Sequence, residues 1–540
     1  MSTNGQLRVR RSLQDLQDDY AKGTKKPLED LMRAWKGIKE LPPDNPRSFF
    51  MLGGFHGEPF RGAGWGNAAY WGGWCQHGNI LFPPWHRAYL VKLEEALQSI
   101  PECGDVMMPY WDETSDESAK NGVPSALTQE TFVLDGATIK NPLRSFMLPR
   151  NITDEIGAID ANNNPANYSK PMGYETVRYP LSGLVGTDED KAATTKHNAL
   201  YPIYAEQVAQ LNLNVRTWLN WQVVVKGKVV ESTKVNVRDK YKSCLDAPNY
   251  TVFSNTTSAQ QWNDERLGTG APMVVPLESP HNSIHLAVGG IDVPSYDRAP
   301  IEGANGDMGE NDTAALDPIF YFHHCFVDRV FWLWQKKHGF TDQLDVIEEY
   351  PGTNSVDSQG PTPGTMPNSW LTLDSPLNPF KKKLADGSEK LYTSRDCINI
   401  EKQLGYTYAH GSLEDSLKEK SLTEAMEGHS TKVVSVSGIN RGAINGSFLV
   451  CVYATIDGER HLVGTESVLS RWKVQYCANC QTHLEVKAFV GLHGFREELL
   501  QPLKKGDYEV EIRTHAGVVK SAQPAPLAAF ARKPFYFEVG

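Results

Sequence analysis

The sequence is poor in cysteine and lacks any long apolar run. Only eight of its 540 residues are cysteine, far below the density of a small secreted domain held together by disulfides. No segment approaches about 18 consecutive apolar residues, which excludes a membrane-spanning helix and argues against a membrane partner. Residues 1–20 carry no apolar signal segment, so we expect a cytoplasmic protein.

The chain also lacks an excess of positive charge. Its 54 Lys and Arg residues are outnumbered by 65 Asp and Glu residues, which gives a formal net charge of −11. Because nucleic acids and anionic membrane surfaces attract basic proteins, we expect neither as a partner. What the chain has is apolar material: 40% of the residues are hydrophobic, enough to bury a sizeable core.

Apolar residues spaced three and four apart predict helices in the first four-fifths of the chain. The expected ranges are 27–39, 83–97, 281–286 and 317–337. The stretch 113–270 is different, because it is rich in Asn, Thr, Pro and Gly and shows helical spacing only near 201–213. We expect long surface excursions there, over a helical centre.

After residue 431 the period changes from helical to alternating. Apolar and polar residues alternate in four runs that we expect to be strands, 433–437, 448–454, 483–490 and 508–513. The preceding segment 411–431 is polar and charge-dense, as in a linker. The sequence thus predicts a mainly α core over 1–410, a linker over 411–431 and a small antiparallel β-sandwich domain over 432–540.

Two groups of histidines stand out among the fifteen in the chain. The first comprises His56, His77 and His86, which lie in glycine-flanked segments and at the start of an expected helix. The second comprises His281, His285 and the adjacent pair His323-His324. Since His281 and His285 are four residues apart, a helix would project both imidazoles from one face, where they can hold one metal ion.

A structural explanation has to be weighed first. A single histidine on an apolar helix is usually a packed core residue, and one HxxxH pattern alone is weak support for a metal. Two triplets bracketed by helix starts, glycines and aromatic residues are hard to explain in that way. Position 282 is Asn, whereas a zinc protease carries Glu there. Three imidazoles without a carboxylate suit copper or zinc, so we expect a pair of metal ions.

Two longer runs resemble the copper-binding signatures of the type-3 dicopper proteins, which are the tyrosinases, catechol oxidases and molluscan haemocyanins. The runs are Cys75–Arg87 and Asp317–Arg329, and the short motifs Pro109-Tyr-Trp-Asp112 and Tyr406-Thr-Tyr408 match as well. This resemblance covers about residues 27–410 and implies a four-helix bundle that holds two copper ions. The β-rich tail is similar to the C-terminal domain of fungal pro-tyrosinases.

The resemblance implies three histidine ligands for each copper. They are His56, His77 and His86 for the first copper, and His281, His285 and His324 for the second. His323 then has a structural role, since a helix turns it about 100° away from His324. Asp112 and Asp328 are candidates to orient an imidazole through its second nitrogen.

Relatives with a Cys-x-His arrangement also join the sulfur to the imidazole ring, so the resemblance implies a thioether between Cys75 and His77. Composition alone would favour a buried free thiol at Cys75. Because the bond would need copper and oxygen to form, a metal-free protein should lack it.

The resemblance further implies an oxidase that uses O₂ to hydroxylate monophenols to o-diphenols and to oxidise these to o-quinones, as in melanin biosynthesis. Glu278 and Asn282 match positions implicated in monophenol-acting members, where they would hold a water that acts as base. A first-turn Glu that complements the helix dipole is the alternative for Glu278. Two other functions stay open: a catechol or o-aminophenol oxidase without the first step, and a haemocyanin-like oxygen carrier, which the absence of repeats disfavours.

The resemblance of the tail to the C-terminal domain of pro-tyrosinases implies regulation of this chemistry. We expect the C-terminal domain to cap the site until a protease cuts the linker around Lys418–Lys420, with an apolar plug near Val468-Leu469 or at Phe495. Cys477 and Cys480 have a spacing that binds soft Cu(I), so they are expected to deliver copper to the core. A redox pair or half a zinc site is the alternative, and a homo-oligomer stays open.

Overall fold

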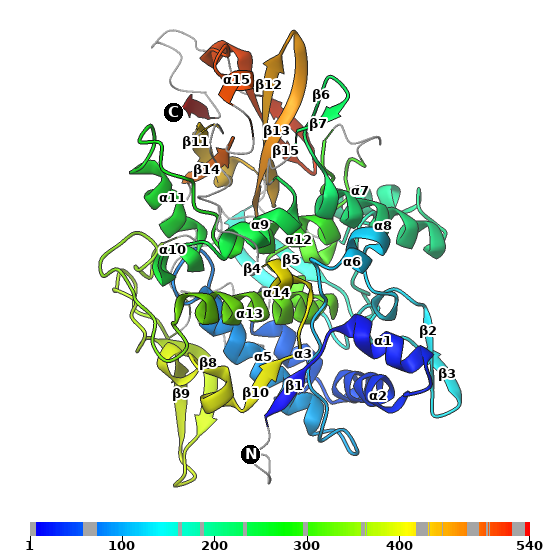
Figure 1. Ribbon diagram of the computed structural model, residues 1–540. Helices are drawn as coiled ribbons and strands as arrows, with labels where there is room; N and C mark the ends of the chain where they lie inside the picture. The colour runs from blue at the N-terminus through cyan, green and yellow to red at the C-terminus, as the bar shows by residue number, and fades with distance from the viewer. Residues whose placement is uncertain are drawn as a thin grey trace.

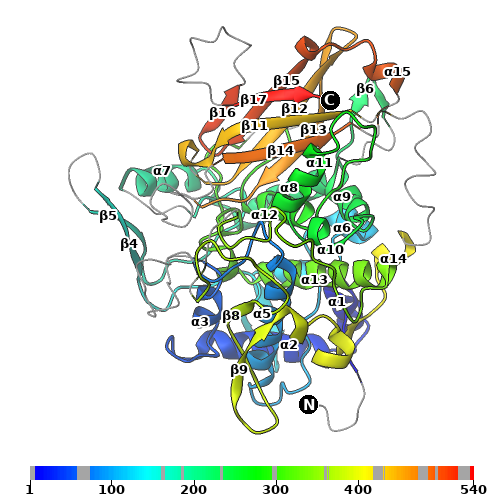
Figure 2. The ribbon, with the colours of Figure 1, turned by 90° about the vertical axis from the view of Figure 1, so that its left-hand side faces the viewer.

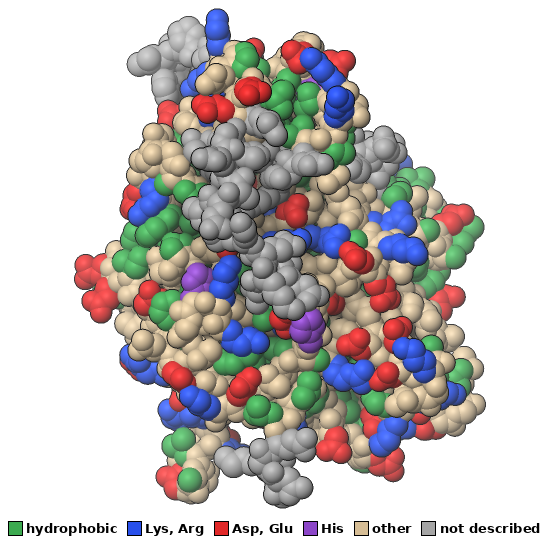
Figure 3. Space-filling model, in the orientation of Figure 1, with side chains coloured by type: hydrophobic (Ala, Val, Ile, Leu, Met, Phe, Trp, Pro, Cys, Tyr) green, Lys and Arg blue, Asp and Glu red, His purple; other side chains and the backbone are tan. Residues whose placement is uncertain are grey.

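The computed structural model places a helical core below a C-terminal β domain (Figure 1). It describes residues 7–57, 73–159, 165–183, 188–230, 235–294, 301–357, 362, 364–416, 430, 432–444, 446–471, 485–492, 495, 497–520 and 535–540. Within these ranges no helix combines the length and apolarity needed to cross a membrane. Acidic and basic side chains are interspersed on the face shown in Figure 3.

Four helices form the centre of the core, as the apolar spacing predicted. They are α2 (Lys26–Glu40), α5 (Phe82–Gln98), α12 (Glu278–Gly289) and α13 (Ile319–His338). Helix α13 crosses the middle of the core and packs against both α5 and α12 (Figure 1). Every residue of α13 from Ile319 to Gln335 is buried, including the polar His323, His324 and Asp328.

Local signals fix where these helices begin and end. Two prolines occupy the first turn of α5, where their missing N–H groups cost no hydrogen bond. Before α13, the Asp317 carboxylate accepts a hydrogen bond from the Ile319 backbone amide at 3.1 Å. The same helix ends at Gly339, whose φ of 76° lies in the left-handed region that favours glycine.

The expectation of surface excursions over 113–270 was wrong for much of this stretch. It contains α6 (Asp116–Asn121), α7 (Asp188–Asn198), α8 (Tyr204–Asn220), α9 (Val237–Cys244), α10 (Tyr250–Ser254) and α11 (Thr256–Asp264). Trp218, Tyr241 and Phe253 are buried in the core. The asparagines that suggested loops are helix caps: the side chains of Asn236 and Asn249 accept backbone amides of the helices that they precede.

The C-terminal region forms the antiparallel sandwich that the alternating pattern predicted. One sheet has the order β14-β11-β17 and the other β13-β12-β15-β16, and Figure 2 shows them stacked above the core. The strands are β11 (Val433–Asn440), β12 (Phe448–Ile456), β13 (Glu459–Val468), β14 (Glu485–Gly491), β15 (Tyr508–Thr514), β16 (Gly517–Lys520) and β17 (Tyr536–Val539). Strand β13 lies against α12, so the sandwich is seated directly on a helix that carries two of the expected ligands.

Short peripheral elements complete the fold. They are β1 (Arg8–Arg10), α1 (Leu13–Ala21), α3 (Phe49–Gly54), β2 (Thr131–Leu134), β3 (Ala137–Lys140), β4 (Ile152–Ile159), β5 (Pro165–Lys170), β6 (Val224–Val225), β7 (Lys228–Val229), β8 (Pro376–Lys383), β9 (Glu389–Thr393), β10 (Tyr406–Tyr408), α14 (Ser412–Ser416) and α15 (Glu497–Leu500). Strand β1 pairs in parallel with β10, which ties the start of the chain to the end of the core.

Candidate metal centre

The structure brings the two predicted histidine groups together in the buried centre. His56, His77 and His86 form one cluster of converging ring nitrogens, and His281, His285, His323 and His324 form the other. Ring centroids in the first cluster lie 5.2–5.7 Å apart. The two clusters touch, because the rings of His86 and His324 stack with centroids 4.3 Å apart.

Different elements supply these side chains. In the first cluster, α5 carries His86, while His56 follows α3 and His77 lies in the loop before α5. In the second, α12 carries His281 and His285 one turn apart, and α13 carries the adjacent pair His323 and His324. Distant parts of the sequence therefore meet at one point of the bundle.

The hydrogen bonds of the rings leave one nitrogen free for a metal. Nδ1 of His56, His86 and His285 lies 2.8–3.2 Å from a backbone carbonyl oxygen. Since a carbonyl oxygen only accepts, each Nδ1 must carry the proton, and Nε2 presents a lone pair. These three Nε2 atoms are buried and have no hydrogen-bond partner among the described residues.

The second cluster shows the spacing of ligands that share an ion. His281 Nδ1 donates to the Asn282 side-chain oxygen at 2.9 Å, which leaves His281 Nε2 as an acceptor. That atom lies 3.2 Å from Nε2 of His324. Two imidazole nitrogens bound to one ion at near-tetrahedral angles lie about 3.3 Å apart, so this pair fits a metal between them.

The electrostatics favour neutral imidazoles, the form that binds metal. Burial, and then the neighbouring histidines, lower the pKa of His281 and His324 well below the ordinary value. Burial lowers the pKa of His86 to about 3. A donor set of neutral imidazoles without a carboxylate suits copper or zinc, so the residues present fit the two copper ions that the family resemblance implies.

His323 differs from the other six histidines. Its Nδ1 shares a hydrogen bond of 2.6 Å with Oε1 of Glu113, and both side chains are fully buried. Its ring stacks on that of His281, with centroids 5.2 Å apart. The bond to Glu113 orients the ring of His323 through Nδ1, and its buried Nε2 has no hydrogen-bond partner among the described residues. The structural role of His323 therefore stays a prediction from the family resemblance. Sequence reasoning missed Glu113, although it directly follows the motif that ends at Asp112.

The roles expected for two aspartates were wrong, because neither bonds an imidazole. Asp112 accepts hydrogen bonds from the backbone amide and the hydroxyl of Ser412, at 2.9 and 2.6 Å. It thus fastens the start of the predicted linker to the core. The two neighbouring side chains point in different directions. Asp112 bonds Ser412 of α14, whereas Glu113 bonds His323 of the second cluster.

Asp328 is instead the centre of a buried ionic network. It pairs with the guanidinium groups of Arg10 and Arg87 at 3.2 and 2.5 Å, and it accepts the hydroxyl hydrogens of Tyr406 and Tyr408 at 2.7 and 2.5 Å. The two arginines lower the pKa of Asp328 despite its burial. The tyrosine motif therefore closes the core through this carboxylate.

Cys75 is buried beside the first cluster. The Asn311 side-chain amide approaches its Sγ at 3.7 Å, and burial raises the pKa of the thiol to about 11. His77, two residues later, has no hydrogen bond to either ring nitrogen among the described residues. A ring without hydrogen bonds needs another restraint to hold its orientation, which is the purpose that a thioether to Cys75 would serve.

Glu278 and Asn282 lie on one face of α12, next to the metal centre. Glu278 accepts hydrogen bonds from the backbone amides of Gly78 and Thr256 at 2.9 and 2.8 Å, and from the Thr256 hydroxyl at 2.9 Å. Burial raises the pKa of Glu278. Both residues line a pocket that also includes His77.

The C-terminal domain closes this pocket from the other side. Its contribution comes from a turn and two strands, and the lining residues are Arg441, Glu466, Ser467, Val468, Leu469 and Val486. Asn282 also approaches the Ser467 carbonyl oxygen, at 3.4 Å. Of the two plug positions expected, Val468-Leu469 lies at the site. Phe495 does not line this pocket, because it is buried and bonded to Ser430 elsewhere in the domain.

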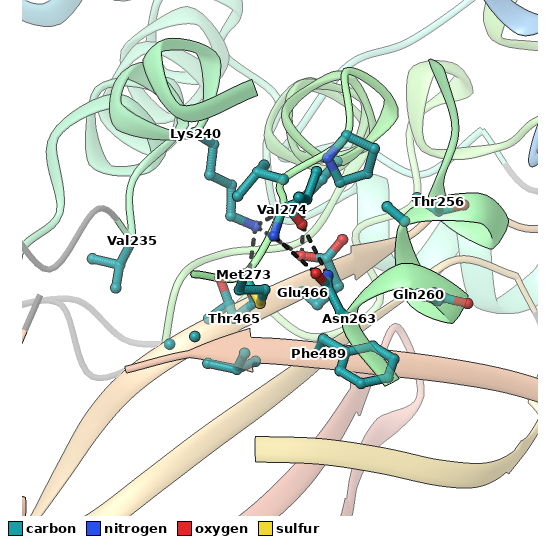
Figure 4. Close-up of a pocket in the computed structure, with 17 residues that line it drawn as sticks. Val235, Lys240, Thr256, Gln260, Asn263, Met273, Val274, Thr465, Glu466 and Phe489 are labelled. Atoms are coloured by element: carbon teal, nitrogen blue, oxygen red, sulfur yellow. Dashed lines mark hydrogen bonds and ion pairs between the residues drawn. The ribbon is translucent and has the colours of Figure 1, made fainter. Parts of the chain in front are cut away.

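A second set of contacts holds the two domains together. Lys240 of α9 pairs with Glu466 of β13 at 3.1 Å, and Ser279 of α12 donates its hydroxyl to the same carboxylate at 2.9 Å. Figure 4 shows Lys240 and Glu466 in a second pocket between the domains, which Val235, Val274 and Phe489 also line. Cys477, Cys480 and the expected cleavage region Lys418–Lys420 lie outside the described residues.

Comparisons with known proteins agree with the site. The family model "Common central domain of tyrosinase" matches residues 46–337. A tyrosinase of Hahella sp. is 53% identical over 96% of this chain and 93% of its own length, and a tyrosinase of Aspergillus oryzae is 46% identical over 91% and 89%. The structure of a tyrosinase from Burkholderia thailandensis, 49% identical, superposes with a TM-score of 0.81 over 99% of this chain and all of that one. A holo-protyrosinase structure from Aspergillus oryzae shares the fold, with a TM-score of 0.63 at 17% identity over 99% of this chain and 92% of that one. The chain belongs to the tyrosinase family, which comprises copper enzymes that oxidise phenols.

Proposed function

We propose that this protein hydroxylates monophenols to o-diphenols and oxidises o-diphenols to o-quinones with O₂, and that its C-terminal domain holds it latent. One observation carries the proposal. His77, Glu278 and Asn282 line a single pocket, and Val468 and Leu469 of the C-terminal domain line the same pocket. The metal centre, the acid–base groups and the cap thus meet at one point.

The bound copper pair would supply the oxygen and electron-transfer chemistry. The protein contributes ligands of fixed orientation: backbone carbonyls hold the Nδ1–H groups of His56, His86 and His285, and the Asn282 side chain holds that of His281. Phe320 packs against rings of both clusters, with centroids 4.7 Å from His56 and 4.1 Å from His324. This packing helps to exclude water, and burial lowers the pKa of His56 and His324 and so keeps these imidazoles neutral.

Glu278 and Asn282 would remove the hydroxyl proton of the phenol through a bound water. A carboxylate has about four lone-pair positions, and protein donors use three on Glu278, so one stays available for a water. Burial raises the pKa of this carboxyl, which makes it a better proton acceptor than an exposed glutamate. Asn282 would hold the same water against the substrate hydroxyl, so that the phenol enters as the phenolate.

Latency follows from the closed pocket. Leu469 and Val468 line the pocket that includes His77, so we infer that they would obstruct a phenol there, and interdomain bonds such as that of Lys240 with Glu466 would keep them in place. A protease that cuts the segment near Lys418–Lys420 would let the sandwich leave. In the same proposal, Cys477 and Cys480 carry Cu(I) to the clusters, because their spacing suits the binding of this soft ion.

The assay is oxygen uptake by copper-loaded protein, intact and after trypsin, with a monophenol and with a diphenol. We expect little uptake before cleavage and uptake with both substrates afterwards. Uptake with the diphenol alone would favour a catechol or o-aminophenol oxidase. Reversible oxygen binding without consumption of either substrate would favour an oxygen carrier and overturn the enzyme proposal.

A further inference from the structure

One loop holds a histidine from each cluster. We call residues 306–313 the strap; it includes a short 3₁₀ turn at Asp307–Gly309. The Met308 carbonyl accepts the Nδ1–H of His285 at 2.8 Å, and the Asn311 carbonyl accepts that of His56 at 3.2 Å. The strap therefore orients one expected ligand of each copper through its backbone.

Glycines let the strap approach both ligand-bearing segments without an intervening side chain. A Cβ atom added to Gly57, next to His56, would overlap the Asp312 carbonyl oxygen. A Cβ atom added to Gly289, at the end of α12, would overlap the Gly309 backbone, and the Gly306 amide donates to the Gly289 carbonyl. Because backbone packs on backbone at both ends, a shift of the strap must move both clusters.

The C-terminal domain holds the opposite side of the strap. The Arg471 guanidinium pairs with the Asp312 carboxylate at 2.5 Å, and both side chains are buried. The backbone amide of Asn311 also donates a hydrogen bond to the Ser470 carbonyl oxygen, at 3.5 Å. Ser470 and Arg471 directly follow Val468 and Leu469, so one segment both covers the pocket and fastens the strap.

We propose that Arg471 is a positioning residue for the copper ligands: through Asp312 it fixes the strap, whose carbonyls fix His56 and His285. The C-terminal domain then secures copper in the centre besides covering it. This inference rests on the proposed copper centre, and it assigns to Arg471 and Asp312 a role distinct from that of the plug at Leu469.

The test compares copper retention in full-length, copper-loaded variants. A chelator is added in excess, and the release of copper is followed together with its stoichiometry. Loss of a group bonded directly to a metal ligand commonly costs about 10- to 100-fold in metal affinity. Because Arg471 acts through Asp312 and the strap, Arg471→Gln should lower the retention of both ions by up to about 10-fold. Arg471→Lys, which keeps the charge, should restore part of it.

Lys240→Met is the control, because it removes another interdomain ion pair, a partly buried one that does not touch the strap. It should leave copper retention close to wild type. In the double variant Arg471→Gln/Asp312→Asn the losses should not add, since both changes break one pair. Unfolding temperatures of the metal-free variants show whether general destabilisation accounts for a loss.

The inference would be overturned if Arg471→Gln retained copper as well as the wild type does. It would also be overturned if Lys240→Met lost as much copper as Arg471→Gln. If the wild-type chain itself binds no copper, the proposed function fails, a result that is separate from either of these. A simultaneous loss of both ions in Arg471→Gln alone supports the strap as the link between the domain and the centre.

Discussion

The imidazoles of His86 and His324 stack with centroids 4.3 Å apart and ring planes only 12° from parallel. One ring comes from α5 and the other from α13, and each belongs to a different cluster. The closest link between the two clusters is therefore a direct contact between expected ligands. Two metal ions held by these clusters would be neighbours, which a reaction that needs both of them requires.

The adjacent pair on α13 gives the first prediction. His324→Asn should reduce bound copper from two ions to one per chain, because its Nε2 lies with that of His281 at the ligand spacing. His323→Asn should keep both ions, because the family resemblance makes His324, the second histidine of the adjacent pair, the ligand. Metal analysis of the purified variants measures the difference. Loss of copper from His323→Asn with full retention in His324→Asn would reverse the assignment.

Asp328→Asn should destabilise the core strongly. The substitution leaves the buried guanidinium groups of Arg10 and Arg87 without their charge partner, and breaking a buried pair costs about 3–5 kcal/mol. Asp374→Asn is the control, since its pair with Arg395 is exposed and worth about 0–1 kcal/mol. Denaturant unfolding of both variants compares the two. Equal losses of unfolding free energy would contradict the network.

Glu278→Gln should separate the two proposed reactions. Without the base, hydroxylation of a monophenol should fall about 100-fold, while oxidation of a diphenol changes little. Thr256→Ala is the control, because it removes a hydroxyl that bonds Glu278 and leaves the carboxylate in place. The measurement is the rate of each trypsin-treated protein, wild type and both variants, with a monophenol and with a diphenol. A parallel fall in the two activities of Glu278→Gln would make Glu278 structural.

Glu310 should make stability depend on pH. Burial raises the pKa of this carboxyl to about 8, so the folded protein keeps the proton while the unfolded chain loses it above its ordinary value near 4.5. The unfolded state then binds fewer protons, and the free energy of unfolding falls as pH rises from about 4.5 to about 8.

Glu310→Gln mimics the protonated form and should remove this dependence. Thermal unfolding of metal-free wild type and variant, between pH 5 and pH 8, measures it. The unfolding temperature of the variant should rise relative to wild type as pH increases. A constant difference between the two proteins would show that Glu310 is ionised in the fold.

Cys75 and His77 should become covalently joined when the protein is loaded with copper in air. A bond between Sγ and a ring carbon replaces one S–H and one C–H bond, and O₂ accepts the two hydrogens. The intact mass should therefore fall by that of two hydrogen atoms, whereas Cys75→Ser should show no such loss. An unchanged mass in fully active wild type would exclude the thioether.

The site was more predictable from the sequence than its surroundings. His281 and His285 are four residues apart, and His86 follows a Pro-Pro helix start, so local spacing predicted their placement. Glu113 and the strap could not be found in this way, because their contacts with His323, His56 and His285 join residues far apart in sequence.

The wrong prediction for residues 113–270 has a local cause. The helices there are mostly short, and the asparagines that cap them also occur often in loops, so only the long helix α8 showed clear helical periodicity in the sequence. The β sandwich was easier to predict, because the alternation of apolar and polar residues in its strands can be seen in the sequence alone. The closure of the pocket by Val468 and Leu469 was expected from family resemblance, since no local pattern marks a plug.

The most direct measurement is anomalous diffraction at the copper edge from crystals of the copper-loaded protein. The account predicts two peaks, one within bonding distance of Nε2 of His56, His77 and His86, and one within bonding distance of Nε2 of His281, His285 and His324. A single peak, or a peak coordinated by His323 in place of His324, would contradict it.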